Sequence, residues 1–355
     1  MKAKAAPELR RLFSKKLDFA KGLVELTHGA GGKASAQLFE ELFQPAFSNS
    51  ALNKGDDGAQ CPGAERLVVA TDSHVVSPLF FPGGDIGALA VHGTVNDVAM
   101  AGGIPQYLTV GFIVEEGFPL SDLRRITQSM ANAADEACVT IVAGDTKVVE
   151  RGKGDGVFIN TTGVGFIPEE LAAPPSAVKA KVGDVILLSG SVGDHGVTIL
   201  AAREALPLSA PIKSDTAPLN GLAAKLLAEV NGVRTLRDPT RGGLATAINE
   251  ICRSSGTGAL LKEDAIPIRR PVDAACELLG VDPLYLANEG KMIAIVDPDS
   301  AYEALQVIRA HPLGADAAII GEIVEDPDNF VQMETAFGGK RLVDWLTGDP
   351  LPRIC

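Results

Sequence analysis

Cysteine pairs and long apolar runs are both missing from this sequence, and each absence excludes a class of protein. The five cysteines are an odd number and none forms a C-x-x-C pair, which argues against a disulfide framework and against a zinc site. The five histidines show no H-x-x-x-H spacing, so we expect any metal to be bound by oxygen. No run approaches the roughly 20 apolar residues of a membrane span. We therefore expect a cytoplasmic protein with no membrane contact.

Positive charge is also scarce. Lysine and arginine number 32 against 45 aspartates and glutamates, which gives a formal net charge of -13. A nucleic-acid binder needs a basic face, and the densest basic cluster, at positions 10–16, is too small to supply one. No apolar segment of a signal peptide follows that cluster. We expect no nucleic-acid partner, and we assign residues 1–22 to an N-terminal extension.

Composition and length predict two globular domains. Apolar residues make up 46% and charged residues 22%, a globular balance, and 355 residues exceed one ordinary core. Strand-like and helix-like segments follow one another over 23–168 and again over 177–330. Between them, Pro168–Ala180 has the composition of a linker. We predict an α+β fold of two mixed α/β domains, followed by a C-terminal region, 331–355, with a mobile tail.

Acidic side chains gather near the predicted elements of the first domain, at Asp56 or Asp57, Asp72, Asp85 and Asp97. Magnesium prefers carboxylate oxygens and usually shares them with substrate phosphates. Asp97 is the sharpest candidate, because a carboxylate in the apolar helix predicted over Ile86–Ala101 is costly to bury without a partner. Each aspartate alone is equally typical of a helix cap or a turn. Together they favour a metal–phosphate site.

Two glycine-rich segments are candidates for anion binding. The loop His28–Lys33 can cradle phosphate with backbone N–H groups, although Thr27 and Ala34 break the P-loop pattern and a tight turn explains the loop equally well. In Asp238–Gly243, Thr240 and Gly242 offer backbone N–H groups at a helix start, and Asp238 can reach a metal. An ordinary helix start is the alternative for this segment.

Three further segments carry chemically useful side chains. Gly144-Asp145-Thr146-Lys147 follows the predicted strand Val139–Ala143 at its carboxyl end, where ligands bind in α/β sheets. Glu289 is a candidate general base, although a lone glutamate before a strand is usually a solvated loop residue. The third is the tail, whose prolines favour an extended chain that can carry Cys355 roughly 25 Å, at ~3.3 Å per residue. A thiolate is a good nucleophile, whereas a tail cysteine with no function is the alternative.

These segments resemble one superfamily in their order along the chain. It contains aminoimidazole ribonucleotide synthetase (PurM), thiamine-monophosphate kinase, selenophosphate synthetase and the hydrogenase maturation factors of the HypE family. The resemblance runs from about Val24 to the end, and the terminal Pro352-Arg353-Ile354-Cys355 is similar to the HypE family specifically. It does not cover residues 1–22.

The resemblance implies a PurM-like homodimer, in which the first domains pair through their sheets into a shared β-barrel with ATP at its edge. Asp57, Asp72, Asp97 and Asp238 would hold Mg²⁺ around the ATP phosphates, with Asp56 an alternative to Asp57. Lys33 and its glycine loop would cover the phosphates, from the same chain or from the partner. The ATP contacts implied are Gly29, Gly31, Gly32, Lys33, Asp85, Gly144, Asp145, Thr146, Thr240 and Gly242.

The resemblance also implies a reaction. A HypF-type carbamoyltransferase would load a carbamoyl group onto Cys355, and this chain would use ATP to phosphorylate the carbamoyl oxygen and dehydrate the group to a thiocyanate. The cyanide would pass to iron in a HypC–HypD-type scaffold for a [NiFe] hydrogenase. Elimination needs a base, for which Glu289 and His92 are candidates, while Lys147 would stabilise charge. His92 has a packed, structural histidine as its alternative, and whether the tail enters its own active site or the partner's stays open.

Two rival functions remain at this point. One is a small-molecule kinase or synthetase of the same fold, in which the tail has no role; the terminal cysteine argues against it. The other is a non-enzymatic carrier whose Cys355 merely holds a group. The carboxylate set argues against a carrier, which needs no magnesium–ATP site.

Overall fold

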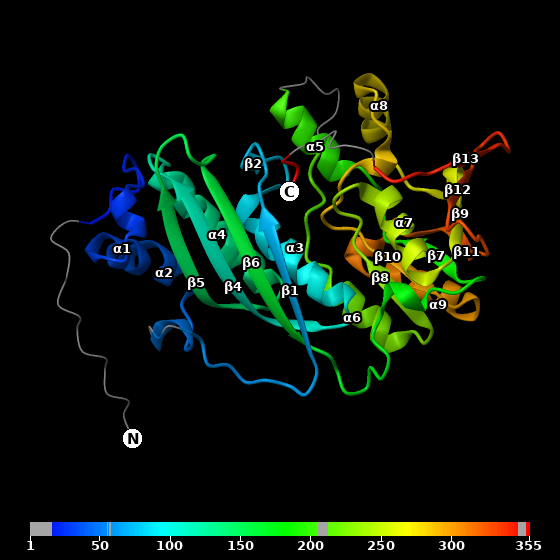
Figure 1. Cartoon of the computed structure of the whole chain (residues 1–355), viewed down its shortest axis with the longest axis horizontal. Helices are drawn as coiled ribbons and strands as arrows, with labels where there is room; N and C mark the ends of the chain where they lie inside the picture. Colours follow the sequence, from blue (N-terminus) through cyan, green and yellow to red (C-terminus); the bar gives the residue numbers. More distant parts are fainter. Residues whose placement is uncertain (1–15, 55, 57, 205–211, 347–352) are drawn as a thin grey trace.

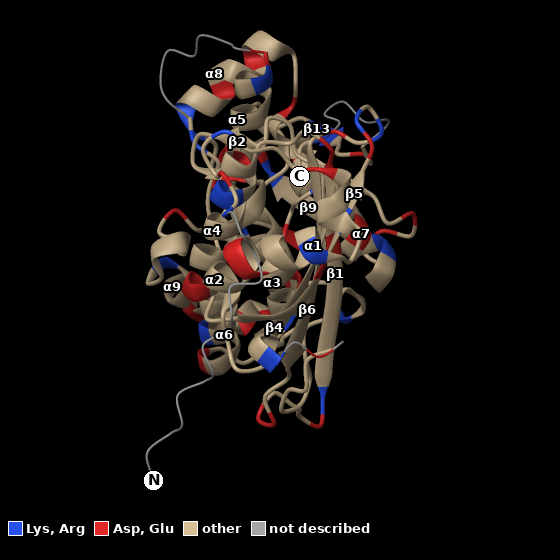
Figure 2. Ribbon diagram, turned by 90° about the vertical axis from the view of Figure 1, so that its left-hand side faces the viewer, with Lys and Arg blue, Asp and Glu red and all other residues tan. Residues whose placement is uncertain are grey.

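The chain folds around two large β-sheets with helices on them, as the computed structural model shows (Figure 1). The structure describes residues 16–54, 56, 58–204, 212–346 and 353–355. Within these residues no helix is long and apolar enough to cross a membrane. Figure 2 shows Lys and Arg interspersed with Asp and Glu over the described elements.

The first sheet has four strands, in the order β1 (Leu67–His74), β6 (Val157–Phe166), β4 (Ile104–Glu115) and β5 (Thr140–Val149). Neighbours are antiparallel except β4 and β5, which are parallel. Helices α3 (Ile86–Met100) and α4 (Leu120–Glu136) cover one face of the sheet (Figure 1). Helix α4 is amphipathic and buries one apolar stripe, whereas α3 is buried almost all round because it also contacts the second domain.

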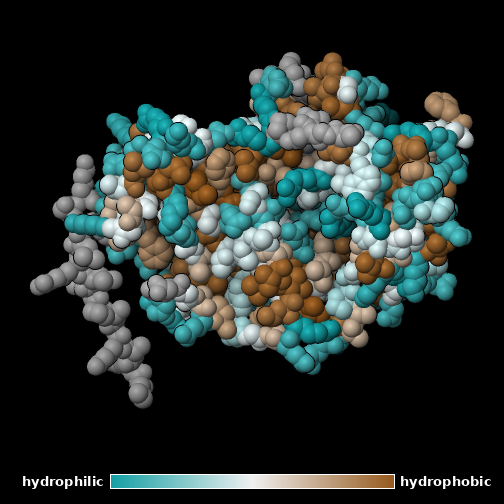
Figure 3. Space-filling model, viewed as in Figure 1, coloured by the Kyte–Doolittle hydropathy of each residue, from teal (hydrophilic) through white to brown (hydrophobic). Residues whose placement is uncertain are grey.

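The opposite face of this sheet carries exposed apolar side chains. Val69 is 64% exposed and Leu67 51% exposed on β1, and Ile113 is 46% exposed on β4. Figure 3 shows apolar side chains gathered on the face of the molecule over the sheet. An apolar patch of this kind on a folded domain marks an interaction surface.

Short elements pack around the first sheet. They are the 3₁₀ turns Leu26–Gly29 and Leu52–Lys54, α1 (Lys33–Leu38), the π-helical turn Phe39–Phe43, α2 (Gln44–Phe47), β2 (Phe80–Phe81) and β3 (Gly84–Asp85). Leu23 makes only an isolated bridge with Pro119, and a 3₁₀ turn begins at Leu26.

The second sheet has seven strands, in the order β13 (Lys340–Leu342), β12 (Val331–Glu334), β9 (Gly258–Lys262), β11 (Ala318–Val324), β7 (Val185–Leu188), β10 (Ile293–Val296) and β8 (Val233–Arg237). Its helices are α5 (Asp194–Arg203), α6 (Asn220–Glu229), α7 (Gly243–Ser255), α8 (Arg270–Leu279) and α9 (Ala301–Arg309). Strands β12 and β13 extend this sheet beyond residue 330, where we predicted the second domain to end.

Successive side chains on the central strands of the second sheet point to opposite faces, so the second domain has a layer on each side of the sheet. On β7, Ile186 and Leu188 pack in the core that includes α7, whereas Leu187 packs in the core formed with α6 and α9. Residues one apart on a strand point to opposite faces. The sheet is therefore covered on both sides, which explains why β7 and β10 are apolar without interruption.

The two domains share apolar contacts rather than meeting at a flexible joint. Val197 and Ile199 of α5 belong to the same buried cluster as Leu89 of α3. At the other end of α3, Ala99 packs with Leu222 of α6. Helix α3 is thus gripped by both domains, and its polar side chains face the junction between them.

Candidate active site

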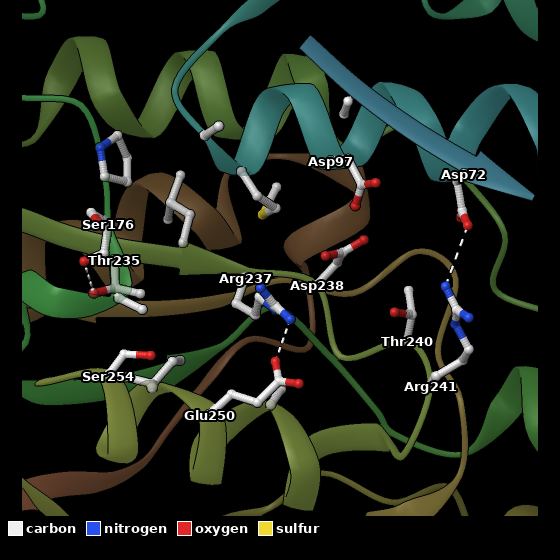
Figure 4. Close-up of a pocket in the computed structure, with 18 of the residues that line it drawn as sticks. Asp72, Asp97, Ser176, Thr235, Arg237, Asp238, Thr240, Arg241, Glu250 and Ser254 are labelled. Atoms are coloured by element: carbon white, nitrogen blue, oxygen red, sulfur yellow. Dashed lines mark hydrogen bonds and ion pairs between the residues drawn. The ribbon is translucent and has the colours of Figure 1, made fainter. Parts of the chain in front are cut away.

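A cleft of about 980 Å³ opens at this junction. Asp72 of β1, Asp97 of α3 and Asp238, which directly follows β8, all line it. In Figure 4, Asp97 and Asp238 come from opposite walls and their carboxylates point toward each other. Three of the four predicted metal ligands are therefore together, while Asp57 lies outside the described residues and Asp56 is exposed.

A glycine brings α3 close to β1. A Cβ built on Gly93 would lie 3.0 Å from Cε1 of His74 and 3.6 Å from a carboxylate oxygen of Asp72. Any larger side chain there would push the helix away from the strand. Gly93 is one turn before Asp97, so this close approach sets the position of the Asp97 carboxylate relative to Asp72.

The pKa values of Asp97 and Asp238 are both raised. Burial first, and then the charges of Asp238 and Asp72, raise the pKa of Asp97 from 3.8 to about 7. Burial is also the main cause that raises the pKa of Asp238 to about 6, and Asp72 adds to it. One carboxylate oxygen of Asp238 is buried without a hydrogen-bond partner among the described residues. Clustered, under-satisfied carboxylates of this kind are the donor set that a hard cation such as Mg²⁺ fits.

The described residues contain no group of three or more His, Cys, Asp or Glu side chains arranged closely enough to hold a metal by themselves. Mg²⁺ typically takes one or two carboxylates and completes its shell with water and substrate phosphates. The open arrangement of Asp72, Asp97 and Asp238 is consistent with that mode of binding.

The segment before α7 supplies groups for an anion. Thr240 lines the cleft, and Gly242 caps α7 with a φ of +74°, a left-handed conformation that favours glycine. The helix start directs backbone N–H groups outward. Arg241 is 73% exposed and its guanidinium lies 3.4 Å from Asp72, at the edge of the cleft (Figure 4).

The end of the chain is docked between the domains. The N–H of Val75 donates to the carbonyl of Cys355 at 3.0 Å, and the N–H of Ser77 donates to that of Arg353 at 3.1 Å. The side chain of Ile354 is 7% exposed and belongs to the first domain's core cluster. The last three residues of the tail that we expected to reach a distant site therefore lie against their own chain, as the position of the C-terminus in Figure 1 also shows.

Docking brings Cys355 to Glu289. The Cys355 thiol lies beside the carboxyl group of Glu289, and burial, followed by the charge of Glu289, raises the pKa of the thiol well above its usual range. The charges of Asp72 and Arg241 also act on this thiol. Tail, glutamate and carboxylate cluster therefore form one site.

Glu289 is suited to proton transfer. It is 3% exposed, and its Oε1 has no hydrogen-bond partner among the described residues. Burial, and then the charges of Asp215 and Asp238, raise the pKa of its carboxyl group well above the ordinary value. Glu289 is therefore not a solvated loop residue, which was the alternative predicted from the sequence. A buried, under-satisfied carboxyl group beside the reacting atom matches a general base.

His92 does not lie beside the thiol in the described contacts. Its Nδ1 lies 3.2 Å from the hydroxyl of Thr216, and its Nε2 lies 3.9 Å from the carboxylate of Glu136. Burial lowers its pKa to about 4. The geometry therefore favours the packed histidine over the second candidate base.

A second, smaller pocket gathers several of the other predicted ATP residues. Its volume is about 220 Å³, and its lining includes Gly29, Gly31, Gly144, Asp145, Thr146 and Lys147. A Cβ on Gly29 would lie 2.4 Å from the backbone nitrogen of Val148, so only glycine lets this loop approach β5 so closely. Gly32 caps α1, whose first residue is Lys33. Of the ten predicted ATP contacts, five therefore line this pocket and Thr240 lines the cleft, whereas the described linings of both lack Gly32, Lys33, Asp85 and Gly242.

Three details of the prediction need correction. Residues 144–147 lie within β5, not after it, because the strand continues to Val149 in parallel pairing with β4. Exposed Lys147 makes an ion pair with Asp145 at 3.1 Å and lies in the second pocket, not beside Cys355 of the same chain. Asp85 is absent from the described lining of the cleft and caps α3 by accepting from the N–H groups of Gly87 and Ala88.

Comparison with known proteins identifies the family. The family described as AIR synthase related protein, N-terminal domain, matches residues 55–167, and its C-terminal counterpart matches residues 181–334. The carbamoyl dehydratase HypE of Azotobacter vinelandii is 62% identical over 343 residues, which are 96% of this chain and 99% of that protein. The chain belongs to the HypE family.

Solved HypE structures agree with this assignment. A hydrogenase maturation protein HypE in complex with ATP has a TM-score of 0.90 at 50% identity, covering 93% of this chain and 99% of that one. The HypE of a HypE–HypF complex has a TM-score of 0.77 at 49% identity, covering 87% of this chain and 99% of that one. The family, the enzyme class and the two-domain PurM-like α/β fold predicted from the ordered motifs are confirmed.

Sequence reasoning missed the residues that hold the end of the chain and those around Glu289. His195 and Arg203 of α5 donate to the carbonyl groups of Ile354 and Arg353, and Asp215 accepts from the N–H of Glu289 at 3.1 Å. Buried His74, with neither ring nitrogen hydrogen-bonded among the described residues, was also missed. The visible signal for His195 was its place in Gly193-Asp194-His195-Gly196, at a helix start.

Proposed function

We propose that this chain uses ATP to dehydrate an S-carbamoyl group on its own Cys355 to a thiocyanate, which supplies cyanide for [NiFe] hydrogenase maturation. One observation carries the proposal: the terminal thiol is docked against the buried carboxyl group of Glu289, at the edge of a cleft lined by Asp72, Asp97 and Asp238. Relatives named carbamoyl dehydratase HypE support it, as does a HypE structure with ATP.

The chemistry has two stages. The carbamoyl oxygen bonds to the γ-phosphorus of ATP as the bond to ADP breaks, which turns a poor leaving group into phosphate. The nitrogen then loses its two protons, the carbon–oxygen bond breaks and the carbon–nitrogen triple bond forms. Glu289 is the base that this second stage needs, because it contacts the sulfur that carries the group.

Asp72, Asp97 and Asp238 would hold Mg²⁺, which when bound neutralises charge on the phosphates. Without a cation, these carboxylates repel both one another and a triphosphate. Thr240 and the N-terminus of α7 add backbone donors for the phosphate oxygens. Arg241, at the edge of the same cleft, adds a positive charge.

A homodimer would join the two pockets. The exposed apolar face of the first sheet, with Val69, Leu67 and Ile113, fits a second copy of the same sheet, which would form the shared barrel. Pairing of this kind would let the glycine loop and Lys33 of one chain cover the ATP phosphates of the other. It would also give Lys147 a role at the partner's site.

Other proteins complete the cycle. A HypF-type carbamoyltransferase would load Cys355, in line with the solved HypE–HypF complex. A HypC–HypD-type iron scaffold would accept the cyanide. The docked tail argues against a small-molecule kinase, because it occupies the position beside the base.

Intact mass spectrometry tests the function. The chain is incubated with the carbamoyltransferase, carbamoyl phosphate and Mg-ATP, beside a Cys355→Ala variant. We expect the natural chain to gain one carbamoyl group and then to lose one water only with ATP. No adduct, or an equal adduct on the variant, would show that the tail is not the substrate.

A further inference from the structure

The last three residues are held through their backbone as well as through their side chains: Ile354 packs in the core, and the Arg353 guanidinium pairs with Asp155. The carbonyl groups of Arg353, Ile354 and Cys355 each accept a hydrogen bond from the body of the protein. Two of these carbonyls are reached by side chains of a single helix, α5. The proposed dehydration needs Cys355 beside Glu289, whereas loading by another enzyme needs it away from there. The strength of this docking therefore matters to both reactions.

His195, near the start of α5, grips the carbonyl next to the cysteine. It is fully buried, and its Nε2 lies 2.7 Å from the carbonyl oxygen of Ile354. A carbonyl oxygen only accepts, so Nε2 carries the proton. Its Nδ1 lies 2.8 Å from the hydroxyl of Ser214, and the ring of Phe81 packs edge-on against the imidazole. The contacts with Ser214 and Phe81 do not involve the tail, and they fix the orientation of the imidazole.

Arg203, the last residue of α5, grips the next carbonyl. Its Nη2 donates to Arg353 at 2.9 Å, and its Nε and Nη2 donate to the carbonyl of Ser77 at 3.2 and 3.1 Å. The same Ser77 pairs with Arg353 through its N–H. One guanidinium therefore joins the second domain, the loop after β1 and the tail. A charged donor makes these bonds stronger than neutral ones.

We propose that His195 and Arg203 form a clamp that positions the tail for dehydration by binding its backbone. The clamp rests on the function proposed above, and it acts through the tail rather than on the reacting atoms. Backbone recognition tolerates a chemical group on the sulfur, so the clamp can hold the thiol and its carbamoyl and thiocyanate forms alike. Weakening it moves the tail toward the undocked form that a carbamoyltransferase can reach.

The test compares variants for two properties of Cys355: how fast its thiol is alkylated and how fast its carbamoyl group is dehydrated. His195→Ala removes the donor, and His195→Gln restores an N–H donor on a side chain of similar reach. Arg203→Met removes the charged guanidinium group and its N–H donors. Arg309→Met is the matched control. Arg309 lies in α9 of the second domain, and it also donates to a backbone carbonyl group, that of Ala317. Each full-length variant is scored for alkylation of the C-terminal peptide by iodoacetamide, for single-turnover dehydration and for ATP affinity.

We expect His195→Ala and Arg203→Met to speed Cys355 alkylation about tenfold and to slow dehydration about tenfold, the loss of one to two hydrogen bonds. Carbamoyl loading becomes faster together with alkylation, because both need the undocked tail, whereas ATP affinity stays as in the natural chain. His195→Gln recovers part of the dehydration rate, and Arg309→Met changes nothing. Unchanged alkylation, or slower dehydration explained by weaker ATP binding, overturns the clamp. If the natural chain does not dehydrate at all, the proposed function fails, and the alkylation rates still decide whether the clamp exists.

Discussion

Asp97→Asn is the substitution whose effects on stability and activity should oppose each other most clearly. In the natural chain the pKa of Asp97 is raised from 3.8 to about 7, mainly by burial and then by Asp238 and Asp72. Each pKa unit corresponds to about 1.4 kcal/mol, so ionising Asp97 in the metal-free fold costs about 4 kcal/mol. Asparagine has the same shape and stays neutral. It therefore removes this cost.

The sign of the pH dependence follows from the raised pKa. The folded state holds the proton more tightly than the unfolded chain, so the cost is absent below about pH 4 and grows until about pH 7. We expect Asp97→Asn to be the more stable protein at pH 8 without Mg²⁺, with an advantage that shrinks toward pH 5. ATP turnover should fall about a hundredfold, as for loss of one transition-state contact.

Thermal unfolding at pH 5 and pH 8, with and without Mg-ATP, is the assay. Exposed Asp264, whose substitution by Asn removes an acid without relieving any repulsion, is the control. Mg-ATP should raise the melting temperature of the natural chain more than that of the variant, because ligands stabilise only the state that binds them. A variant that is less stable than the natural chain by the same amount at both pH values would refute the reasoning.

Three further predictions concern single residues. Glu289→Gln should slow dehydration by about a hundredfold or more while loading of Cys355 continues, as followed by intact mass, because the general base is lost; normal dehydration would remove Glu289 from that role. Val69→Asp should give folded monomers by light scattering and circular dichroism, because Val69 is 64% exposed in the single chain and lies on the proposed interface; a dimer that persists would place the interface elsewhere. Arg241→Gln should raise the KM for ATP about tenfold, because one charged contact is lost. An unchanged KM would show that Arg241 does not contact the ATP phosphates.

The sequence predicted the site best where a residue conflicted with its surroundings. Asp97 stood out as a carboxylate inside an apolar helix, and the structure puts it in the cleft with Asp72 and Asp238. Glu289 and Cys355 were separate predictions from the sequence, and the fold brings them side by side.

Long-range arrangement is what local patterns could not supply. His195 reaches a carbonyl 159 positions away, and Arg203 reaches one 150 positions away, so neither contact leaves a signal in spacing. The polar run Gly144–Lys147 looked like a loop, but pairing with β4 keeps it in the strand. The short strands β12 and β13 lie in a segment that we assigned to the tail region, and they form only by pairing at the edge of the second sheet.

The most direct test of the account follows one oxygen atom. Cys355 is loaded with a carbamoyl group whose oxygen is ¹⁸O, the carbamoyl phosphate is removed, and Mg-ATP is added to the isolated protein. If the carbamoyl oxygen is phosphorylated and leaves, the inorganic phosphate released should carry one ¹⁸O atom for each thiocyanate formed. Unlabelled phosphate, with the label lost to water, would contradict phosphorylation of the tail as the driving step.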